Sequence, residues 1–229
     1  MRIPWTEPDA AEAEACRERM ISEQIAARGI RDPRILAAFR RVPRHLFCPP
    51  GTSLAQAYGD HPLPIGHGQT ISQPLMVAEM TARLQLREDT KALEVGTGSG
   101  YQAAILACLV AEVHTVERLV PLADEARDRL ARLGFANVRV HAADGTLGWP
   151  VEAPYDAIVV TAAAPAVPES LKRQLADRGC LAIPVGPRHL QELLLVERHG
   201  QQFVTHQGGG CRFVPLIGRE GWSESTWFA

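Results

Sequence analysis

The sequence has no excess of charge of either sign and no long apolar run. Its 229 residues carry 24 Lys and Arg against 26 Asp and Glu, a formal net charge of −2. Proteins whose main partner is a nucleic acid or an anionic membrane normally carry a basic excess or a basic stripe. The longest apolar candidate, residues 103–113, is shorter than the ~20 residues that a membrane span requires. We therefore expect a protein that binds neither nucleic acid nor a membrane.

Cysteine is sparse, and its spacing matches neither a metal site nor a disulfide scaffold. The five cysteines form an odd set without a Cys-x-x-Cys pair, and the eight histidines are scattered. This pattern excludes a zinc knuckle and disfavours disulfide bonds, so we expect reduced thiols and no metal. Charged residues occur throughout the first thirty positions, so we expect no secretory signal. We expect the protein to be located in the cytoplasm.

Short apolar segments alternate with helical periods in the middle of the chain. We expect strands at Lys91–Val95, 113–117, Val138–Ala142, 157–161 and 181–185, and helices at 101–110, 119–133 and 168–176. Such repeated units predict an α/β fold with a doubly wound, mostly parallel sheet. Beyond residue 186 the pattern changes to strands alone, which we expect to form an antiparallel edge at 192–197, 202–206 and 212–217.

The first third of the chain lacks this alternation and predicts a helical and loop extension. Residues 12–28 favour a helix that ends at Gly29, and a second helix begins at Pro33 with Asp32 as its cap. Residues 48–73 are rich in proline and glycine without a helical period, which is typical of a functional loop. We expect a single domain, 1–229, with a cap at about 1–73, a core at about 74–186 and strands at about 187–222.

A glycine-rich loop, residues 94–100, follows the first strand of the predicted sheet. In an open parallel sheet a ligand binds at this place, and Gly96 and Gly98 would let it approach the backbone closely. The spacing differs from the dinucleotide fingerprint because the third glycine comes one residue early and Tyr101 stands in its place. A Gly-Lys-Ser/Thr sequence is also missing, which excludes a P-loop.

Carboxylates follow three consecutive predicted strands, at Glu94, at Glu117 and at Asp144-Gly145. Glu94 would repel a pyrophosphate but attract a ligand that carries an ammonium and a sulfonium. Glu117 can accept hydrogen bonds from both ribose hydroxyls, and Asp144 can accept one from an adenine amino group. Each acid alone could instead be a helix cap or a surface charge. Together they indicate a methyltransferase that uses S-adenosylmethionine.

Motifs on both sides of the glycine loop are shared with one family. They are Tyr58-Gly59-Asp60, Pro62-Leu63-Pro64-Ile65-Gly66, Gly68-Gln69-Thr70-Ile71-Ser72-Gln73-Pro74, 93–102, Asp144-Gly145, Gly148-Trp149-Pro150, 153–158, Ile183-Pro184-Val185-Gly186 and Phe213-Val214-Pro215-Leu216. With this set the chain resembles the protein-L-isoaspartate (D-aspartate) O-methyltransferase family over about residues 20–222. The glycine loop is common to many methyltransferases, whereas the stretch 69–74 is specific to this family.

The resemblance implies a Rossmann-like class I methyltransferase fold with S-adenosylmethionine as cofactor. The implied acceptor is the free carboxylate of L-isoaspartyl and D-aspartyl residues in damaged proteins and peptides, whose ester collapses to a succinimide and so starts repair. Ser72 would be the active-site residue, with a hydroxyl that donates to the substrate carboxylate or orders the loop; a plain helix cap is the alternative. The other implied contacts are Thr70, Ile71 and Gln73 over the cofactor, and Val214, Pro215 and Leu216 along an extended peptide.

This chemistry needs neither a general base nor a metal. A carboxylate with a pKa near ~4 is already a nucleophile at neutral pH, so the protein has to orient it and exclude water. We expect a monomer that acts on isoaspartyl proteins and peptides. Three other hypotheses stay open. The first is a methyltransferase of the same fold with a small molecule or biosynthetic peptide as acceptor, and the second is a non-catalytic nucleoside-binding module. The third is a nicotinamide dehydrogenase, which the glycine spacing and Glu94 disfavour.

Overall fold

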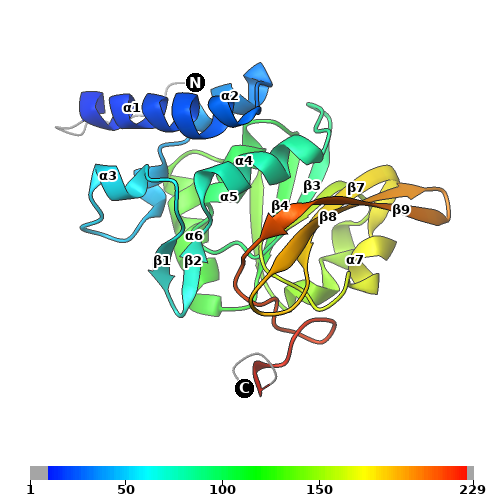
Figure 1. Ribbon diagram of the computed structural model, residues 1–229. Helices are drawn as coiled ribbons and strands as arrows, with labels where there is room; N and C mark the ends of the chain where they lie inside the picture. Colours follow the sequence, from blue (N-terminus) through cyan, green and yellow to red (C-terminus); the bar gives the residue numbers. More distant parts are fainter. Residues whose placement is uncertain (1–9, 226–229) are drawn as a thin grey trace.

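The computed structural model of the protein describes residues 10–225 and is built around a seven-stranded sheet (Figure 1). The strands are β3 (Lys91–Val95), β4 (Glu112–Glu117), β5 (Val138–Ala142), β6 (Tyr155–Val160), β7 (Leu175–Val185), β8 (Gln191–His199) and β9 (Gln202–Cys211). Their order is β5-β4-β3-β6-β7-β8-β9; the pairs from β5 to β7 are parallel, and those of β8 are antiparallel. The predicted fold class is confirmed.

Successive residues of the central strands face opposite sides of the sheet, and both sides are apolar. In β6, Ala157 and Val159 belong to one hydrophobic cluster, and Ile158 and Val160 belong to another. The first cluster includes side chains of α4 (Pro74–Arg83), α5 (Tyr101–Ala107) and α6 (Val120–Arg132). The second includes Leu171 of α7 (Glu169–Arg173). Helices therefore cover both faces, as a parallel sheet requires.

The N-terminal third forms the two expected helices. α1 (Ala10–Arg19) continues through a π-helical turn (Met20–Ile25) and a 3-10 turn (Ala26–Arg28) to Gly29, where φ is +100°. α2 (Pro33–Arg41) begins where the Asp32 carboxylate accepts a hydrogen bond from the Arg34 amide at 2.8 Å. Met20 and Phe39 belong to the same hydrophobic cluster as α4 and α5, and Figure 1 shows α1 and α2 lying above those helices.

Residues 48–73 are more regular than predicted. They contain a short helix, α3 (Leu54–Ala57), and an antiparallel hairpin of β1 (Leu63–Gly66) and β2 (Gln69–Ile71). The turn residues His67 and Gly68 both have positive φ, +51° and +69°. Two such residues in succession form a turn whose twist matches the paired strands. Pro62 and Pro64 hide β1 from a prediction based on composition, because proline is depleted in strands.

The predicted strand at 212–217 is wrong. Pro215 has no amide hydrogen to donate to a sheet, so the segment forms only isolated bridges. The Ala163 amide donates to the Val214 carbonyl at 2.7 Å, and the Leu216 amide donates to the Ala163 carbonyl at 2.8 Å. These bonds fix the C-terminal segment beside the carboxyl end of β6. β7 also begins earlier than predicted, at Leu175, which limits the preceding helix to α7.

The strand order reverses at β3, with β4 and β5 on one side and β6 on the other. In open α/β sheets, ligands bind beyond the carboxyl ends of the strands at such a reversal. The glycine loop after β3 and the residues that follow β4, β5 and β6 meet there. Between residues 10 and 225, no helix is long and apolar enough to cross a membrane.

Candidate active site

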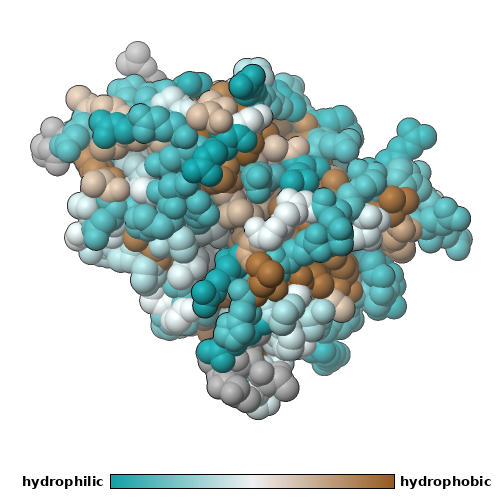
Figure 2. Space-filling view, viewed as in Figure 1, coloured by the Kyte–Doolittle hydropathy of each residue, from teal (hydrophilic) through white to brown (hydrophobic). Residues whose placement is uncertain are grey.

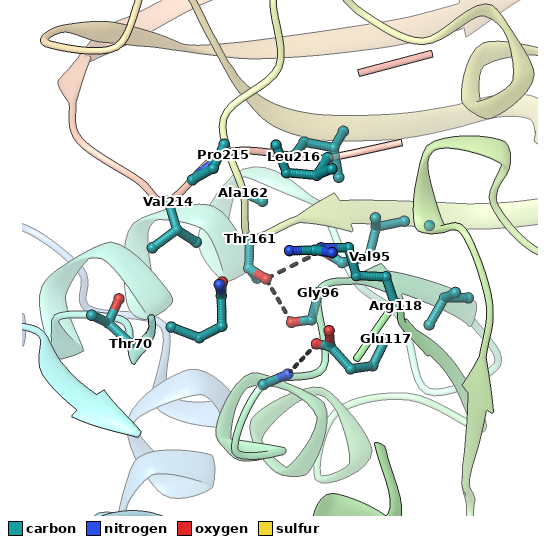
Figure 3. A pocket seen from close by; sticks show the side chains of 15 residues that line it. Thr70, Val95, Gly96, Glu117, Arg118, Thr161, Ala162, Val214, Pro215 and Leu216 are labelled. Atoms are coloured by element: carbon teal, nitrogen blue, oxygen red, sulfur yellow. Dashed lines mark hydrogen bonds between the residues drawn. The ribbon is translucent and has the colours of Figure 1, made fainter. Parts of the chain in front are cut away.

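A cavity opens at the carboxyl ends of β3, β4 and β6, and we call it the inner cavity (Figure 3). Its walls come from the glycine loop, the ends of three strands, β2 and the C-terminal segment. It is lined by Gln69, Thr70, Val95, Gly96, Gly98, Val116, Glu117, Arg118, Gly145, Thr161, Ala162, Val214, Pro215, Leu216 and Ile217. Segments far apart in the sequence therefore complete one site.

Gly96 and Gly98 of the glycine loop hold backbone conformations that favour glycine, with φ of +99° and +50°. A Cβ atom at Gly96 would lie 2.5 Å from Thr161 Oγ1. That hydroxyl donates to the carbonyls of Gly96 at 2.7 Å and of Val95 at 3.1 Å (Figure 3). Thr161 has no motif of its own in the sequence, because its role depends on the pairing of β6 with β3.

Glu117 at the end of β4 holds the loop from the other side. Its Oε2 accepts a hydrogen bond from the Gly98 amide at 3.0 Å, and its Oε1 accepts one from the Leu119 amide at 3.0 Å. The side chain is buried and lines the inner cavity, as Figure 3 shows. An ionised carboxylate can accept about four hydrogen bonds, so it retains capacity for a ligand.

Glu94 lines an adjoining pocket together with Thr70, Ile71 and Ser72. The side chain is fully buried, its Oε2 accepts a hydrogen bond from the Thr115 hydroxyl at 2.5 Å, and its Oε1 has no hydrogen-bond partner in the described part of the chain. Burial raises the pKa of Glu94 to about 8, and the neighbouring Glu117 acts in the same direction. A cationic group at Oε1 would favour the charged form.

The predicted residues from Thr70 in β2 to Gln73 do not all line the same space. Ser72, Thr70 and Ile71 line the adjoining pocket with Glu94. Gln73 does not line it; its side chain donates to Asp60 Oδ1 at 2.8 Å. Gln73, and not Ser72, occupies the N-cap position of α4, and it makes no side-chain capping bond. The hydroxyl of Ser72 is therefore not used as a helix cap.

Asp144 follows β5, and its carboxylate is bonded both to its own turn and to the C-terminal segment. Its Oδ1 accepts hydrogen bonds from the Thr146 amide at 2.9 Å and hydroxyl at 2.7 Å, and its Oδ2 accepts one from the Arg219 amide at 2.8 Å. Gly145 lines the inner cavity, whereas Asp144 does not. A Cβ atom at Gly145 would lie 2.7 Å from Val95 Cγ1. The predicted contact of Asp144 with an adenine amino group stays a prediction.

A second depression, which we call the outer groove, lies beside the inner cavity. It is lined by Pro62, His67, Gly68, Gln69, Thr70, Ser72, Gln73, Met76, Arg118, Arg188, Gly210, Cys211, Arg212, Phe213, Val214, Pro215 and Glu224. Gln69, Thr70, Arg118, Val214 and Pro215 line both spaces, so the two adjoin. The space-filling view shows apolar patches among hydrophilic side chains (Figure 2). The groove could hold a peptide beside the ligand of the inner cavity.

The family profile described as "Protein-L-isoaspartate(D-aspartate) O-methyltransferase (PCMT)" matches residues 15–221. The chain belongs to this family. A protein-L-isoaspartate O-methyltransferase of Methanoregula boonei is 55% identical over 206 residues, which cover 90% of this chain and 94% of that protein. The enzyme of the same name from Methanoculleus marisnigri is 56% identical over 215 residues, covering 92% of this chain and 97% of that protein.

Solved structures of the family share the fold. One protein-L-isoaspartate O-methyltransferase superposes with a TM-score of 0.83 at 28% identity, covering 90% of this chain and 67% of that chain. A Plasmodium falciparum protein in complex with S-adenosyl-L-homocysteine superposes with a TM-score of 0.75 at 24% identity, covering 90% of this chain and 98% of that chain. At 24% identity, the similarity to the Plasmodium falciparum structure shows a shared fold and nothing more.

Gly96→Ala should weaken S-adenosylmethionine binding by about tenfold or more, because the added Cβ displaces either the loop or Thr161. The matched control is Gly134→Ala, since Gly134 has φ of +78° with no atom within 4 Å of an added Cβ. Both variants should lose about 1–2 kcal/mol of stability from left-handed strain. Isothermal titration calorimetry checks the difference, and equal affinities for the two variants would contradict it.

Glu94→Gln should remove a pH dependence from the stability of the ligand-free protein. Between the ordinary pKa of 4.5 and about 8, folded Glu94 keeps a proton that the unfolded chain has lost. The free energy of unfolding of the wild type therefore falls as the pH rises through this window. The Tm of the variant relative to the Tm of the wild type should therefore increase as the pH rises. The variant should also bind S-adenosylmethionine at least about tenfold more weakly.

Thermal unfolding across this pH window and calorimetry in buffers of different ionisation enthalpy check the prediction for Glu94. Below pH ~8, binding of the cationic ligand to the wild type should release a proton, and binding to the variant should not. Exposed Glu88→Gln is the control and should change neither measurement. Proton release that persists in Glu94→Gln would assign the titration to another group.

Proposed function

We propose that this chain transfers the methyl group of S-adenosylmethionine to the free carboxylate of L-isoaspartyl and D-aspartyl residues in proteins and peptides. The adjacent backbone amide nitrogen then attacks the ester carbonyl and expels methanol, and hydrolysis of the resulting succinimide partly restores normal aspartate. One observation carries the proposal: a pocket with a buried, half-satisfied carboxylate at Glu94 adjoins a peptide-sized groove, and Ser72 lines both. Membership of the family supports the same activity.

The residues at the inner cavity and the adjoining pocket fit the proposed cofactor. Glu94 Oε1 is a buried acceptor without a partner in residues 10–225, and the ligand's ammonium group can donate to it. Glu117 has capacity left for ribose hydroxyls, and Gly96, Gly98 and Gly145 leave the backbone accessible. S-adenosylmethionine, when bound, supplies an electrophilic methyl group. The remaining task of the protein is to place an acceptor oxygen in line with that methyl group and to exclude water.

Ser72 is the proposed positioning group for the acceptor. Its hydroxyl lies at the boundary between the adjoining pocket and the outer groove, where it can donate a hydrogen bond to a carboxylate. A donor to one oxygen orients the other toward the methyl group, and no base has to remove a proton because the carboxylate is already ionised. Thr70 lines the inner cavity, the adjoining pocket and the outer groove, and so separates the two ligands.

Peptide backbone would pair with the Val214 amide and the Pro215 carbonyl rather than with Leu216, because the Val214 carbonyl already accepts from the Ala163 amide and proline has no amide hydrogen. The Leu216 amide donates to Ala163, and the Leu216 carbonyl accepts from the Trp222 amide at 2.8 Å. Leu216 is also buried and does not line the outer groove, whereas Val214 and Pro215 do. Contact through the main chain is independent of side-chain identity, which suits an enzyme that accepts many sequences around one abnormal linkage.

We further propose one catalytic domain that acts as a monomer in the cytoplasm, without a metal, a nucleic acid or a membrane as partner. The N-terminal helices share a hydrophobic cluster with the sheet, which supports one domain. All five cysteines are free thiols, which supports a reducing compartment. Between residues 10 and 225, no cluster of three His, Cys, Asp or Glu side chains could hold a metal ion.

Incubation with methyl-labelled S-adenosylmethionine and an isoaspartyl peptide should give base-labile label. The matched peptide with a normal aspartyl residue should give almost none, because its backbone continues from the α-carboxyl group and its free carboxylate lies one methylene further from Cα than the free α-carboxylate of an isoaspartyl residue. Equal labelling of both would refute the specificity. Labelling of a small carboxylic acid or a biosynthetic peptide in preference to the isoaspartyl peptide would favour the alternative acceptor class.

Ser72→Ala should lower kcat by about 10- to 100-fold, the loss expected for one hydrogen bond to a charged group, with a smaller change in cofactor affinity. Glu117→Ala should do the reverse, because it removes a ribose acceptor and releases the Gly98 amide. Steady-state kinetics and calorimetric titration with S-adenosylmethionine separate the two effects. Ser72→Thr retains the hydroxyl and should recover part of kcat. If Ser72→Ala and Glu117→Ala changed kcat and cofactor affinity to the same extent, the roles of Ser72 and Glu117 would be misassigned.

A further inference from the structure

The outer groove carries a local excess of positive charge. Arg118, Arg188 and Arg212 line it, and Glu224 is the single acidic residue among its described lining residues. Arg118 Nη1 donates to Glu224 Oε1 at 3.2 Å, so these two charges compensate each other. Arg188 and Arg212 are exposed, and neither forms an ion pair within residues 10–225. Two uncompensated guanidinium groups therefore face a space that could hold a peptide.

Some exposed arginines elsewhere on the protein have an acidic partner, whereas others, such as Arg31 and Arg139, form no ion pair within residues 10–225. Ion pairs join Arg34 to Asp32 at 3.1 Å, Arg40 to Glu18 at 2.9 Å and Arg87 to Asp89 at 3.0 Å. Near the groove, burial raises the pKa of the Cys211 thiol to about 11, and Glu79 and Glu192 act in the same direction, but neither glutamate lines the groove. Within residues 10–225 neither glutamate forms an ion pair with Arg188 or Arg212, and Glu192 Oε2 instead accepts a hydrogen bond from the Gln207 side chain at 3.0 Å.

The two arginines lie on the wall that would guide the peptide. Arg188 is in the connection between β7 and β8, and Arg212 follows β9 directly. Val214 and Pro215 continue the same wall toward the inner cavity. An extended peptide advances about 3.3 Å per residue, so side chains within a few residues of the reacting carboxylate would pass these guanidinium groups.

We propose that Arg188 and Arg212 bind carboxylate side chains that flank the isoaspartyl residue, and so give the enzyme a preference for acidic flanking sequences. The inference rests on the proposed function, because it assigns a sequence preference to the same peptide site. A guanidinium group can bind a carboxylate through two parallel hydrogen bonds, which a hydroxyl or an amide cannot match. A lysine or arginine in the flanking sequence would be repelled by the same wall.

The expected preference is small because both arginines are exposed. Ion pairs between exposed groups are worth about 0.2–1 kcal/mol, which corresponds to up to about fivefold in kcat/KM. Salt should reduce the preference, because about 1 M salt shortens the screening length to about 3 Å. Main-chain pairing at Val214 and Pro215 should be insensitive to salt, so turnover of a neutral peptide should persist at high ionic strength.

The test compares three isoaspartyl peptides at each of the three flanking positions on either side; the three differ at that position alone, with Glu, Gln or Lys. Wild-type kcat/KM at low salt should rank Glu above Gln above Lys at one or more positions, by about two- to fivefold between Glu and Gln. The double variant Arg188→Gln, Arg212→Gln should bring the ratio of Glu to Gln close to one. Arg31→Gln removes an exposed charge outside the groove and should leave the wild-type ratio unchanged.

A ratio of one at every position in the wild type would overturn the inference, and so would a preference that survives in the double variant. Both results leave the proposed function intact if the Gln peptide is methylated at its isoaspartyl residue. Absence of methylation of all three peptides, with activity on another carboxylic acid, would instead refute the proposed function and the inference with it.

Discussion

The hydrogen bond from the Gly98 amide to the Glu117 carboxylate is the contact on which the rest of the site depends. It ties the glycine loop after β3 to the end of β4, and Thr161 ties the same loop to the end of β6 through the Gly96 carbonyl. The loop is thus fixed between its two neighbouring strands, in a conformation that residues with a Cβ atom rarely adopt. Because these bonds are made within the protein, the cavity is preformed rather than built by its ligand.

Two carboxylates close to each other have different surroundings. Glu117 accepts two backbone amides and has room for more donors. Glu94 is fully buried, with one hydroxyl donor and one oxygen without a partner in the described chain, and its pKa is raised to about 8. The first carboxylate therefore organises the backbone, whereas the second is unfavourable for folding until a cationic group compensates it. The buried Glu94 carboxylate thus lowers the stability of the ligand-free protein and raises the affinity for a cationic ligand.

The sequence allowed the βα order, the glycine loop and the three acids to be predicted, because each depends on residues close together in the chain. The sequence does not reveal site residues whose role depends on distant parts of the chain. Thr161 reaches the glycine loop because β6 lies next to β3. Arg118 lines the cavity together with the hairpin and the C-terminal segment. The hairpin β1–β2 was missed because proline obscured the strand, although His67-Gly68 is a turn signal. Asp144 lies after a strand, as predicted. Its carboxylate, for which we predict a hydrogen bond from adenine, accepts hydrogen bonds from the Thr146 and Arg219 amides.

One wall of the inner cavity is made by Val214, Pro215, Leu216 and Ile217, near the end of the chain. The opposite wall includes Gln69 and Thr70, and the sheet that separates the two in sequence has to form before they can meet. Synthesis on the ribosome proceeds from the N-terminus, so β3 to β7 can pair while this wall is still missing. The site consequently remains open on one side until residues 214–217 have been synthesised, and until then a nascent chain has no enclosed place in which to hold a reactive methyl donor.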